Sequence, residues 1–311
     1  MGAGEGGLTA AETTPVVRRR ERRGGEGGGR FTTALLLLPG SVWFLLLLVA
    51  PLVILAIYSL GLRAPAGGYQ PALTLAQYAK LPTRAVAFRN TAIIALASTL
   101  LCIVVAFPLA YFLATRTARW KTLLLVLVIV PFWTSFLIRT YAWLVILGSN
   151  GIPALVREAG LASDLVLLNT PFAVMLGIVY NYLPLTVFPI YVSLERLDKR
   201  LLEASRDLGA PPWRTLWQVT VPLAAPGIIT GALLVFILLS GEYVIPAMLG
   251  GNKVFLLGNA LVDLFIQARD WPLGSAVAVS MILGMLVTIG IYMRVTSRWM
   301  RGTGRGGVSL V

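Results

Sequence analysis

The sequence has 311 residues, of which 57% are hydrophobic and 13% are charged, with 26 Lys and Arg against 13 Asp and Glu. Soluble globular proteins usually carry about 25% charged residues, so this composition indicates an integral membrane protein. The chain has one cysteine, Cys102, and no histidine, which excludes an internal disulfide, a His-ligated metal site and a Ser-His or Cys-His nucleophile pair. We therefore expect no catalytic residue, no metal, no cofactor and no enzymatic activity.

The net charge of +13 raises the possibility of nucleic-acid binding, but the positions of the charges argue against it. If the N-terminus is cytoplasmic, Lys and Arg lie mostly in the cytoplasmic tails and loops. This positive-inside distribution predicts a multi-pass protein of the cell (inner) membrane with both termini in the cytoplasm. The basic side chains are then expected to contact anionic lipid head groups and not nucleic acid.

Residues 1–30 are rich in Gly, Glu and Arg and predict a disordered cytoplasmic tail. A first transmembrane helix is expected within residues 31–62, because its apolar run far exceeds the core of about 7–15 residues found in cleavable signal peptides. Residues 296–311 predict a second cytoplasmic tail. In all, apolar stretches of about 20 residues predict an all-α polytopic protein with six transmembrane helices. The predicted spans are Ala34–Leu60, Thr91–Leu113, Thr122–Leu147, Pro171–Leu194, Leu223–Ile245 and Gly274–Met293.

The loop over residues 195–222, between the fourth and fifth spans, begins with signals for a helix. Asp198 is a good N-cap, because its carboxylate can accept a hydrogen bond from an amide of the first turn. Leu197 and Leu202 have the spacing of a hydrophobic staple. The side chains of Leu201, Ala204, Ser205 and Leu208 are expected to form one narrow stripe.

The same loop contains signals that end the helix. Gly209 supplies a residue that favours the left-handed conformation, and Pro211 and Pro212 prevent continuation and favour a new start. We expect a helix of about ten residues and then a second short helix through Trp213, Leu216 and Trp217. The loop could be an amphipathic connector lying on the bilayer or a surface that another protein binds.

The loop resembles a known motif, the EAA loop of ABC importer permeases. The similarity lies in Glu203-Ala204-Ser205, three residues, Gly209, nine residues and Val219-x-Val221-Pro222, with conservative departures at positions 205, 219 and 221. In that family the loop forms a coupling helix that sits in a cleft of the cytoplasmic ATPase. The resemblance therefore implies a type I importer permease fold, and it assigns a set of residues to ATPase coupling. These are Glu203, Ala204, Ser205, Asp207, Gly209 and Pro222.

Three further segments resemble the spermidine/putrescine-type permeases. They cover residues 131–143, 180–191 and 240–251. With the loop, they place the ABC permease transmembrane core at residues 85–295. The resemblance implies a polyamine importer that works by alternating access.

The energy source is expected on another chain. The sequence contains no G-x-x-x-x-G-K-[ST] phosphate-binding loop, and none of its four lysines follows a glycine. The resemblance implies as partners a cytoplasmic ATP-binding subunit, a second permease that is identical or homologous, and an extracytoplasmic substrate-binding protein.

Two charged residues fall at membrane depth, where a charge costs about 2.5–3.5 kcal/mol on insertion scales. Glu242, near the outer end of the fifth span, is expected to line the path of a cation, with Tyr243 offering a π-face; the alternative is an interfacial or ion-paired carboxylate. Arg139 is expected to snorkel or to pair with Glu242. Tyr180 and Tyr182 either line the same path or belong to an interfacial aromatic belt.

Other functions stay open at this point. The same importer class carries opines, thiamine, ferric iron or small oxyanions as alternative substrates. An ATP-independent carrier or channel would need polar relays at mid-membrane, and this sequence offers few. A membrane enzyme would need clustered acids, histidines or a serine-base pair.

Overall fold

The computed structural model describes residues 26–115, 120–161, 164–251 and 253–302. The chain divides into two compact units, Met1–Leu52 and Val53–Val311. Most of the predicted N-terminal tail (residues 1–25) and the last nine residues lie outside the described part. The described part of the first unit is helical, and its side chains at positions 35–49 are exposed, as expected for a lipid-facing span.

Most of the described residues are helical, and two strands of two residues each, β1 and β2, form a short antiparallel hairpin. The elements in chain order are α1 (Glu26–Ser59), β1 (Leu62–Arg63), β2 (Tyr69–Gln70), α2 (Ala76–Ala79), η1 (Leu81–Arg84), α3 (Ala85–Thr115), α4 (Lys121–Trp133), α5 (Phe136–Leu147), α6 (Ile152–Glu158), α7 (Pro171–Glu195), α8 (Lys199–Asp207), α9 (Pro212–Thr215), η2 (Leu216–Thr220), α10 (Val221–Ser240), α11 (Val244–Leu249), α12 (Leu257–Val262), η3 (Asp263–Gln267) and α13 (Trp271–Gly302).

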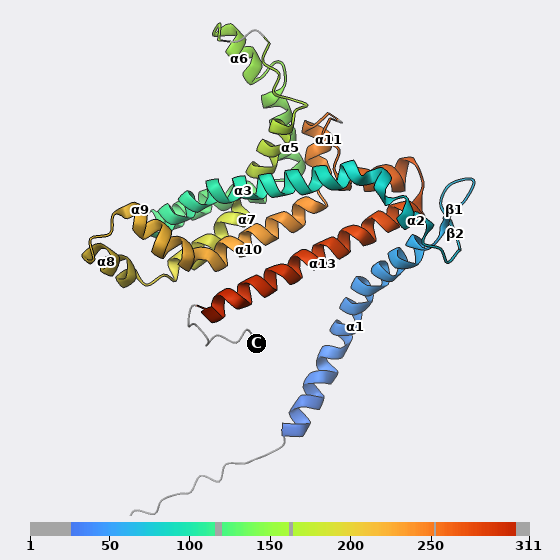
Figure 1. The fold of residues 1–311 in the computed structure, drawn as a ribbon, viewed down its shortest axis with the longest axis horizontal. Helices are drawn as coiled ribbons and strands as arrows, with labels where there is room; N and C mark the ends of the chain where they lie inside the picture. The colour runs from blue at the N-terminus through green and yellow to red at the C-terminus, as the bar shows by residue number, and fades with distance from the viewer. Residues whose placement is uncertain (1–25, 116–119, 162–163, 252, 303–311) are drawn as a thin grey trace, which may run out of the picture. The chain divides into compact units, whose positions relative to one another are not determined.

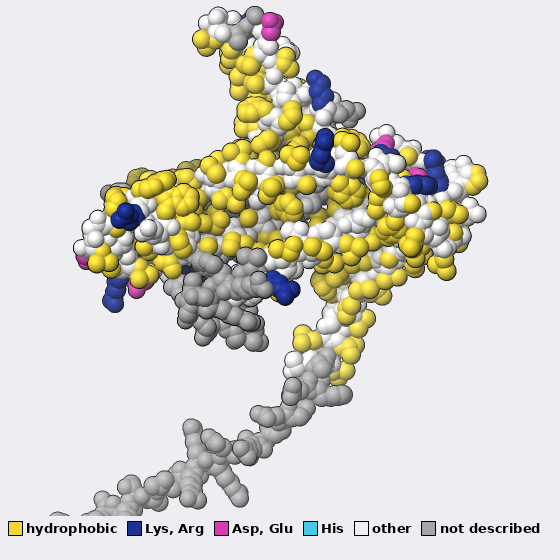
Figure 2. All heavy atoms as spheres, viewed as in Figure 1, with side chains coloured by type: hydrophobic (Ala, Val, Ile, Leu, Met, Phe, Trp, Pro, Cys, Tyr) yellow, Lys and Arg dark blue, Asp and Glu magenta, His cyan; other side chains and the backbone are white. Residues whose placement is uncertain are grey.

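Helices α3, α7 and α10 form the centre of the second unit and lie side by side (Figure 1). Their contact is close because small residues face the neighbouring helix. A Cβ atom on Gly227 of α10 would lie 2.3 Å from the Pro189 carbonyl oxygen of α7. Ile178, Ile190 and Leu239 are buried in the resulting core. The side of the bundle seen in Figure 2 is covered mainly by hydrophobic side chains, as a lipid-facing surface requires.

Within the described residues, five helices are long and apolar enough to cross a membrane, and they match five of the six predicted spans. Two helix ends differ from the prediction. α1 begins at Glu26, inside the predicted disordered tail, and α13 continues to Gly302, inside the predicted C-terminal tail. Both extensions follow from helix cooperativity, because each residue added to an existing helix gains a hydrogen bond without a new nucleation step.

The third predicted span, Thr122–Leu147, is present as a bent pair of helices and not as one straight helix. The segment is divided into α4 and α5, which are bent by 91° at Thr134 and Ser135. Pro131 has no amide hydrogen and weakens the last turn of α4. The Thr134 hydroxyl then donates to the Pro131 carbonyl at 2.7 Å, which satisfies a carbonyl at the helix end and fixes the break.

The fifth span also ends earlier than predicted, because α10 stops at Ser240 and α11 starts at Val244. Pro246 explains the interruption. In a continuous helix, its ring would clash with the carbonyl of residue 242 and its missing amide would leave that carbonyl unpaired. The three-residue segment Gly241-Glu242-Tyr243, here called the α10–α11 elbow, therefore leaves the helical path.

Candidate coupling and translocation sites

The start of α8 has the capping contacts that its sequence predicts. The Asp198 carboxylate accepts a hydrogen bond from the Arg200 amide at 3.0 Å. Leu197 and Leu202 line the same small hollow beside Leu194 and Thr220, so the apolar staple rests on the end of the bundle. This hollow also includes Thr115, which places α8 at the C-terminal end of α3.

The end of α8 is a Schellman turn. Gly209 has φ +73°. Its amide donates to the Arg206 carbonyl at 2.8 Å, and the Ala210 amide donates to the Ser205 carbonyl at 3.1 Å. A Cβ atom on Gly209 would meet nothing within 4 Å. Glycine is therefore favoured at position 209 because of its positive φ, and not because a larger side chain would clash.

The segment after α8 differs from the predicted second short helix. α9 and η2 lead directly into α10, so that residues 212–240 form one long apolar element. The widened π-turn of η2 has a simple cause, because Pro222 has no amide to donate to the Gln218 carbonyl and its ring needs room there. The Ser205 and Thr215 hydroxyls lie 2.9 Å apart and join α8 to α9.

The predicted coupling residues form the exposed end of this unit. Glu203, Ala204 and Asp207 are exposed on α8, and Leu208 is 88% exposed. Pro222 lies in the first turn of α10. An exposed leucine on a capped helix that is tied to α9 gives a rigid apolar projection at this end of the bundle (Figure 1).

The Lys121 ammonium pairs with the Glu195 carboxylate and joins the start of α4 to the end of α7. The same ammonium lies 5.4 Å from the centre of the Tyr191 ring. These contacts fasten α4 to the end of the bundle that carries α8.

Glu242 lies at the α10–α11 elbow and is 7% exposed. One carboxylate oxygen accepts hydrogen bonds from the Val244 amide at 2.8 Å and the Ile245 amide at 3.1 Å. The other oxygen accepts a hydrogen bond from the Tyr182 hydroxyl of α7 at 2.5 Å. The carboxylate therefore caps α11, where a negative charge also suits the positive end of the helix dipole, and it ties the elbow to α7.

Arg139 is 8% exposed, and its guanidinium carbon lies 5.5 Å from the centre of the Phe132 ring. The pairing of Arg139 with Glu242, which the sequence left open beside snorkelling, is not present among the described residues, where Arg84 pairs with Asp263 and Lys121 with Glu195. The Nε atom of Arg139 is buried without a hydrogen-bond partner.

Tyr180 and Tyr243 have different surroundings, although both were predicted to line a cation path. The Tyr180 ring packs edge-on against Trp143 at 5.4 Å and remains 40% exposed. Tyr243 is 47% exposed and lines a cavity of about 470 Å³. Of the five predicted pathway residues, Tyr182 is thus hydrogen-bonded to Glu242, and Tyr243 lines the cavity.

This cavity, here called the α11–η3 cavity, contains residues that sequence reasoning missed. Its wall is formed by Tyr243, Ala247, Phe255, Asn259, Val262, Asp263 and Gln267. Asp263 interrupts an otherwise apolar stretch, Leu257–Gln267, and that isolated charge is the signal that was available in the sequence. Asp263 also pairs with Arg84, just before α3, so the cavity lies at the opposite end of α3 from α8.

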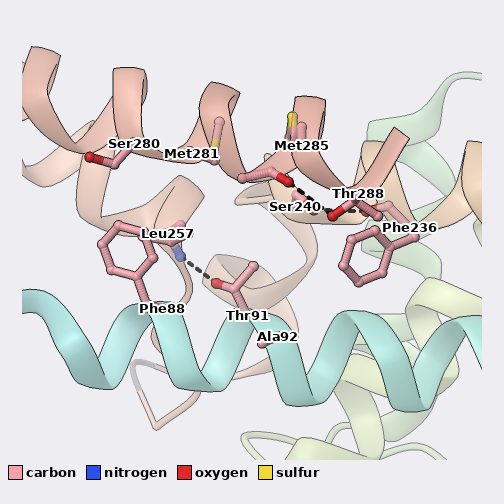
Figure 3. A pocket seen from close by; sticks show the side chains of 11 residues that line it. Phe88, Thr91, Ala92, Phe236, Ser240, Leu257, Ser280, Met281, Met285 and Thr288 are labelled. Atoms are coloured by element: carbon pink, nitrogen blue, oxygen red, sulfur yellow. Dashed lines mark hydrogen bonds between the residues drawn. The ribbon is translucent and has the colours of Figure 1, made fainter. Parts of the chain in front are cut away.

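A second cavity lies between α3, α10, α12 and α13 and has a volume of about 180 Å³ (Figure 3). Phe88, Phe236 and Met281 form part of its wall, and no charged side chain lines it. At its edge, the Leu257 amide donates to the Thr91 hydroxyl at 2.8 Å, which fastens the start of α12 to α3.

Comparison with known proteins agrees with this architecture. Residues 6–301 match the family described as binding-protein-dependent transport system inner membrane component. The chain is 36% identical over 256 residues to the spermidine/putrescine transport system permease protein PotB of Haemophilus influenzae, covering 81% of this chain and 90% of that protein. It is 30% identical over 244 residues to the inner membrane ABC transporter permease protein YdcU of Escherichia coli, covering 73% and 76%.

Solved structures share the fold at low sequence identity. A bacterial ABC transporter involved in the import of alginate contains a chain with a TM-score of 0.69 and 15% identity, covering 87% of this chain and 96% of that one. The MetNI methionine ABC transporter, in an inward-facing conformation, contains a chain with a TM-score of 0.54 and 18% identity, covering 71% and 97%. The chain belongs to the binding-protein-dependent transport inner membrane family, and it is the permease subunit of an ABC importer.

Proposed function

We propose that this permease imports polyamines of the spermidine and putrescine type. The observation that carries this proposal is the 36% identity to a spermidine/putrescine permease over 81% of the chain. Opines, thiamine, ferric iron and small oxyanions remain the competing substrates. The α11–η3 cavity adds support, because it contains a carboxylate and two aromatic rings and no basic side chain lines it.

The proposed partners are a cytoplasmic ATP-binding subunit, a second permease and an extracytoplasmic binding protein. The structure of α8 suits contact with the ATP-binding subunit. Its N-cap, its Schellman turn and the Ser205–Thr215 contact hold it in one orientation, so little conformational entropy is lost when a partner binds. Leu208 would be buried in the ATPase cleft, and Glu203 would make polar contacts at its edge.

Movement of the ATPases would reach the membrane through α9 and η2, since these continue into α10 without a loop. A rigid connection transmits displacement, whereas a flexible loop would absorb it. α10 ends at the α10–α11 elbow, which Glu242 fastens to α7 through Tyr182. We propose that Glu242 acts on the pathway through this bond, by positioning α11 and Tyr243.

The proposed orientation places α8 and both termini in the cytoplasm. It is supported by the distribution of Lys and Arg. Cysteines introduced at Leu208 and Leu161 would test it with a membrane-impermeant maleimide, because these residues are 88% and 79% exposed and Cys102 is buried. In intact cells position 161 should label and position 208 should not; labelling in the reverse pattern would invert the topology.

The substrate is tested by uptake. The permease and the partners encoded beside its gene would be expressed in cells that lack polyamine uptake, and accumulation of radiolabelled spermidine and putrescine would be measured. We expect ATP-dependent accumulation that unlabelled polyamine inhibits and that excess thiamine or an opine does not. Accumulation of labelled thiamine, an opine, ferric iron or an oxyanion, with no accumulation of polyamine, would assign a different substrate to the same importer.

A further inference from the structure

The α11–η3 cavity combines features that suit an organic cation. Its volume of about 470 Å³ is within the range of about 300–1,000 Å³ typical of small-molecule sites. Asp263 supplies a carboxylate, Tyr243 and Phe255 supply aromatic rings, and Gln267 supplies an amide oxygen. Although the whole chain has twice as many basic as acidic residues, no Lys or Arg lines this cavity.

The carboxylate of Asp263 is only weakly engaged by the rest of the chain. Its one ion pair is with Arg84, at 3.7 Å, which exceeds hydrogen-bonding distance. The two side chains are 28% and 34% exposed, and ion pairs between partly exposed side chains are weak because water screens the charges. An ammonium group that forms a shorter, charge-assisted hydrogen bond can therefore compete with Arg84 for this carboxylate.

Glu242 differs from Asp263 in this respect. Its carboxylate accepts two backbone amides and the Tyr182 hydroxyl, so both of its oxygens are already used. The Glu242 carboxylate therefore has a structural role at the elbow, and the Asp263 carboxylate is the acidic group that lines the α11–η3 cavity.

The walls of the cavity are fixed by hydrogen bonds. The Asn259 side-chain amide donates to the Tyr243 carbonyl at 3.1 Å, and its oxygen accepts from the Leu256 amide at 3.3 Å. The first bond joins α12 to the α10–α11 elbow, and the second caps the start of α12. The Thr91–Leu257 bond fastens α12 to α3 in turn (Figure 3). A site with fixed walls loses little entropy when it binds a ligand.

We propose that the α11–η3 cavity is a binding site for an alkylammonium group of the transported polyamine, with Asp263 as its counter-charge. The Tyr243 and Phe255 rings offer π-faces to the ammonium and apolar surface to the methylene chain. Gln267 accepts a hydrogen bond from a second N–H. This inference rests on the proposed function, because a polyamine carries the alkylammonium groups that the cavity suits.

The test uses the complete importer, assembled with its ATPase, partner permease and binding protein and reconstituted into liposomes. Uptake of radiolabelled spermidine would be measured with the binding protein saturated, for the wild type, Asp263→Asn and Asp263→Glu. We expect Asp263→Asn to lower uptake about tenfold, since hydrogen bonds to charged groups contribute about 1.5–3 kcal/mol. Asp263→Glu should restore part of the rate. Basal ATP hydrolysis and the yield of assembled complex should not change.

Arg84→Gln separates binding from a structural role. If Asp263 acted only through its ion pair with Arg84, the Arg84→Gln variant would lose uptake as Asp263→Asn does. If Asp263 binds the cation, removal of the competing guanidinium should leave spermidine uptake in the same assay unchanged or raise it. Glu158→Gln, on the exposed end of α6, serves as a control for the loss of one negative charge outside the cavity.

The outcomes are distinguishable. Two results would overturn the inference and leave the proposed function intact. The first is spermidine uptake by Asp263→Asn equal to that of the wild type. The second is a loss of uptake in Arg84→Gln equal to the loss in Asp263→Asn. An assembled wild-type importer that hydrolyses ATP but takes up neither spermidine nor putrescine would overturn the proposed function together with the inference.

Discussion

The two ends of the α3–α7–α10 bundle are constructed differently. At the α8 end, a helix of nine residues is capped by its own neighbours in sequence and exposes Glu203 and Leu208. At the α11–η3 end, Tyr243, Phe255 and Asp263 come from three separate segments and line a hollow. A projecting, locally stabilised helix suits contact with another protein, whereas a hollow with a carboxylate suits a small cation. The difference supports our proposal that ATPase coupling and cargo recognition lie at opposite ends of α3.

The largest expected effect is that of Glu203→Arg at the α8 end. A reversed charge where a partner contact is expected should cost about 2–5 kcal/mol of coupling energy and reduce substrate-stimulated ATP turnover more than tenfold. ATP turnover would be measured on the purified complex. Glu158→Arg, an exposed glutamate on α6, is the matched control and should have little effect. Full stimulated turnover in Glu203→Arg would contradict the coupling role of α8.

At the α10–α11 elbow, the expected effect is on the stability of the permease and not on ATP turnover. Glu242→Ala removes the acceptor for two backbone amides and for the Tyr182 hydroxyl, and each buried group left unpaired costs about 1–3 kcal/mol. Glu242→Gln keeps one carbonyl acceptor for the amides, so this variant should be less destabilised than Glu242→Ala. Thermal unfolding of the purified permease in detergent would rank the variants.

Uptake by the Glu242→Gln variant then tests whether Glu242 positions α11 or contacts the cargo itself. Uptake that falls in proportion to stability fits a carboxylate that positions α11. A tenfold loss of uptake in a Glu242→Gln protein with wild-type unfolding temperature would mean that Glu242 itself meets the cargo, and the cation site would have to include the elbow.

Next in size is Gly209→Ala, which should destabilise the end of α8 by about 1 kcal/mol, because alanine is disfavoured at φ +73°. Gly241→Ala is a matched control, since an added Cβ has open space at both glycines and Gly241 has φ −100°. The affinity of the permease for its ATPase would be measured for both variants. Equal effects would show that the turn conformation after α8 is unimportant.

The smallest effect is expected for Asp198→Ala, which removes the N-cap of α8 and should cost about 1 kcal/mol. Asp198→Asn keeps the capping oxygen and should behave as the wild type. The same affinity measurement would detect a loss of about fivefold for Asp198→Ala. If Asp198→Asn lost as much affinity as Asp198→Ala, the charge and not the cap would be responsible.

The sequence by itself determined the spans and the α8 projection. Long apolar runs cross a membrane because the backbone must satisfy its own hydrogen bonds there, and this constraint can be recognised in one dimension. The caps of α8 at Asp198 and Gly209 join residues two to five positions apart, so their pattern is also visible in sequence.

Only the tertiary structure decided the direction of α5, the role of the Glu242 carboxylate and the existence of the α11–η3 cavity. The 91° bend between α4 and α5 sets the direction of α5, and the Tyr182–Glu242 bond joins residues 60 positions apart. Asp263 becomes a candidate cation ligand only when η3 is placed beside Tyr243. Such contacts depend on how helices pack, and helix packing is not encoded in any local run of residues.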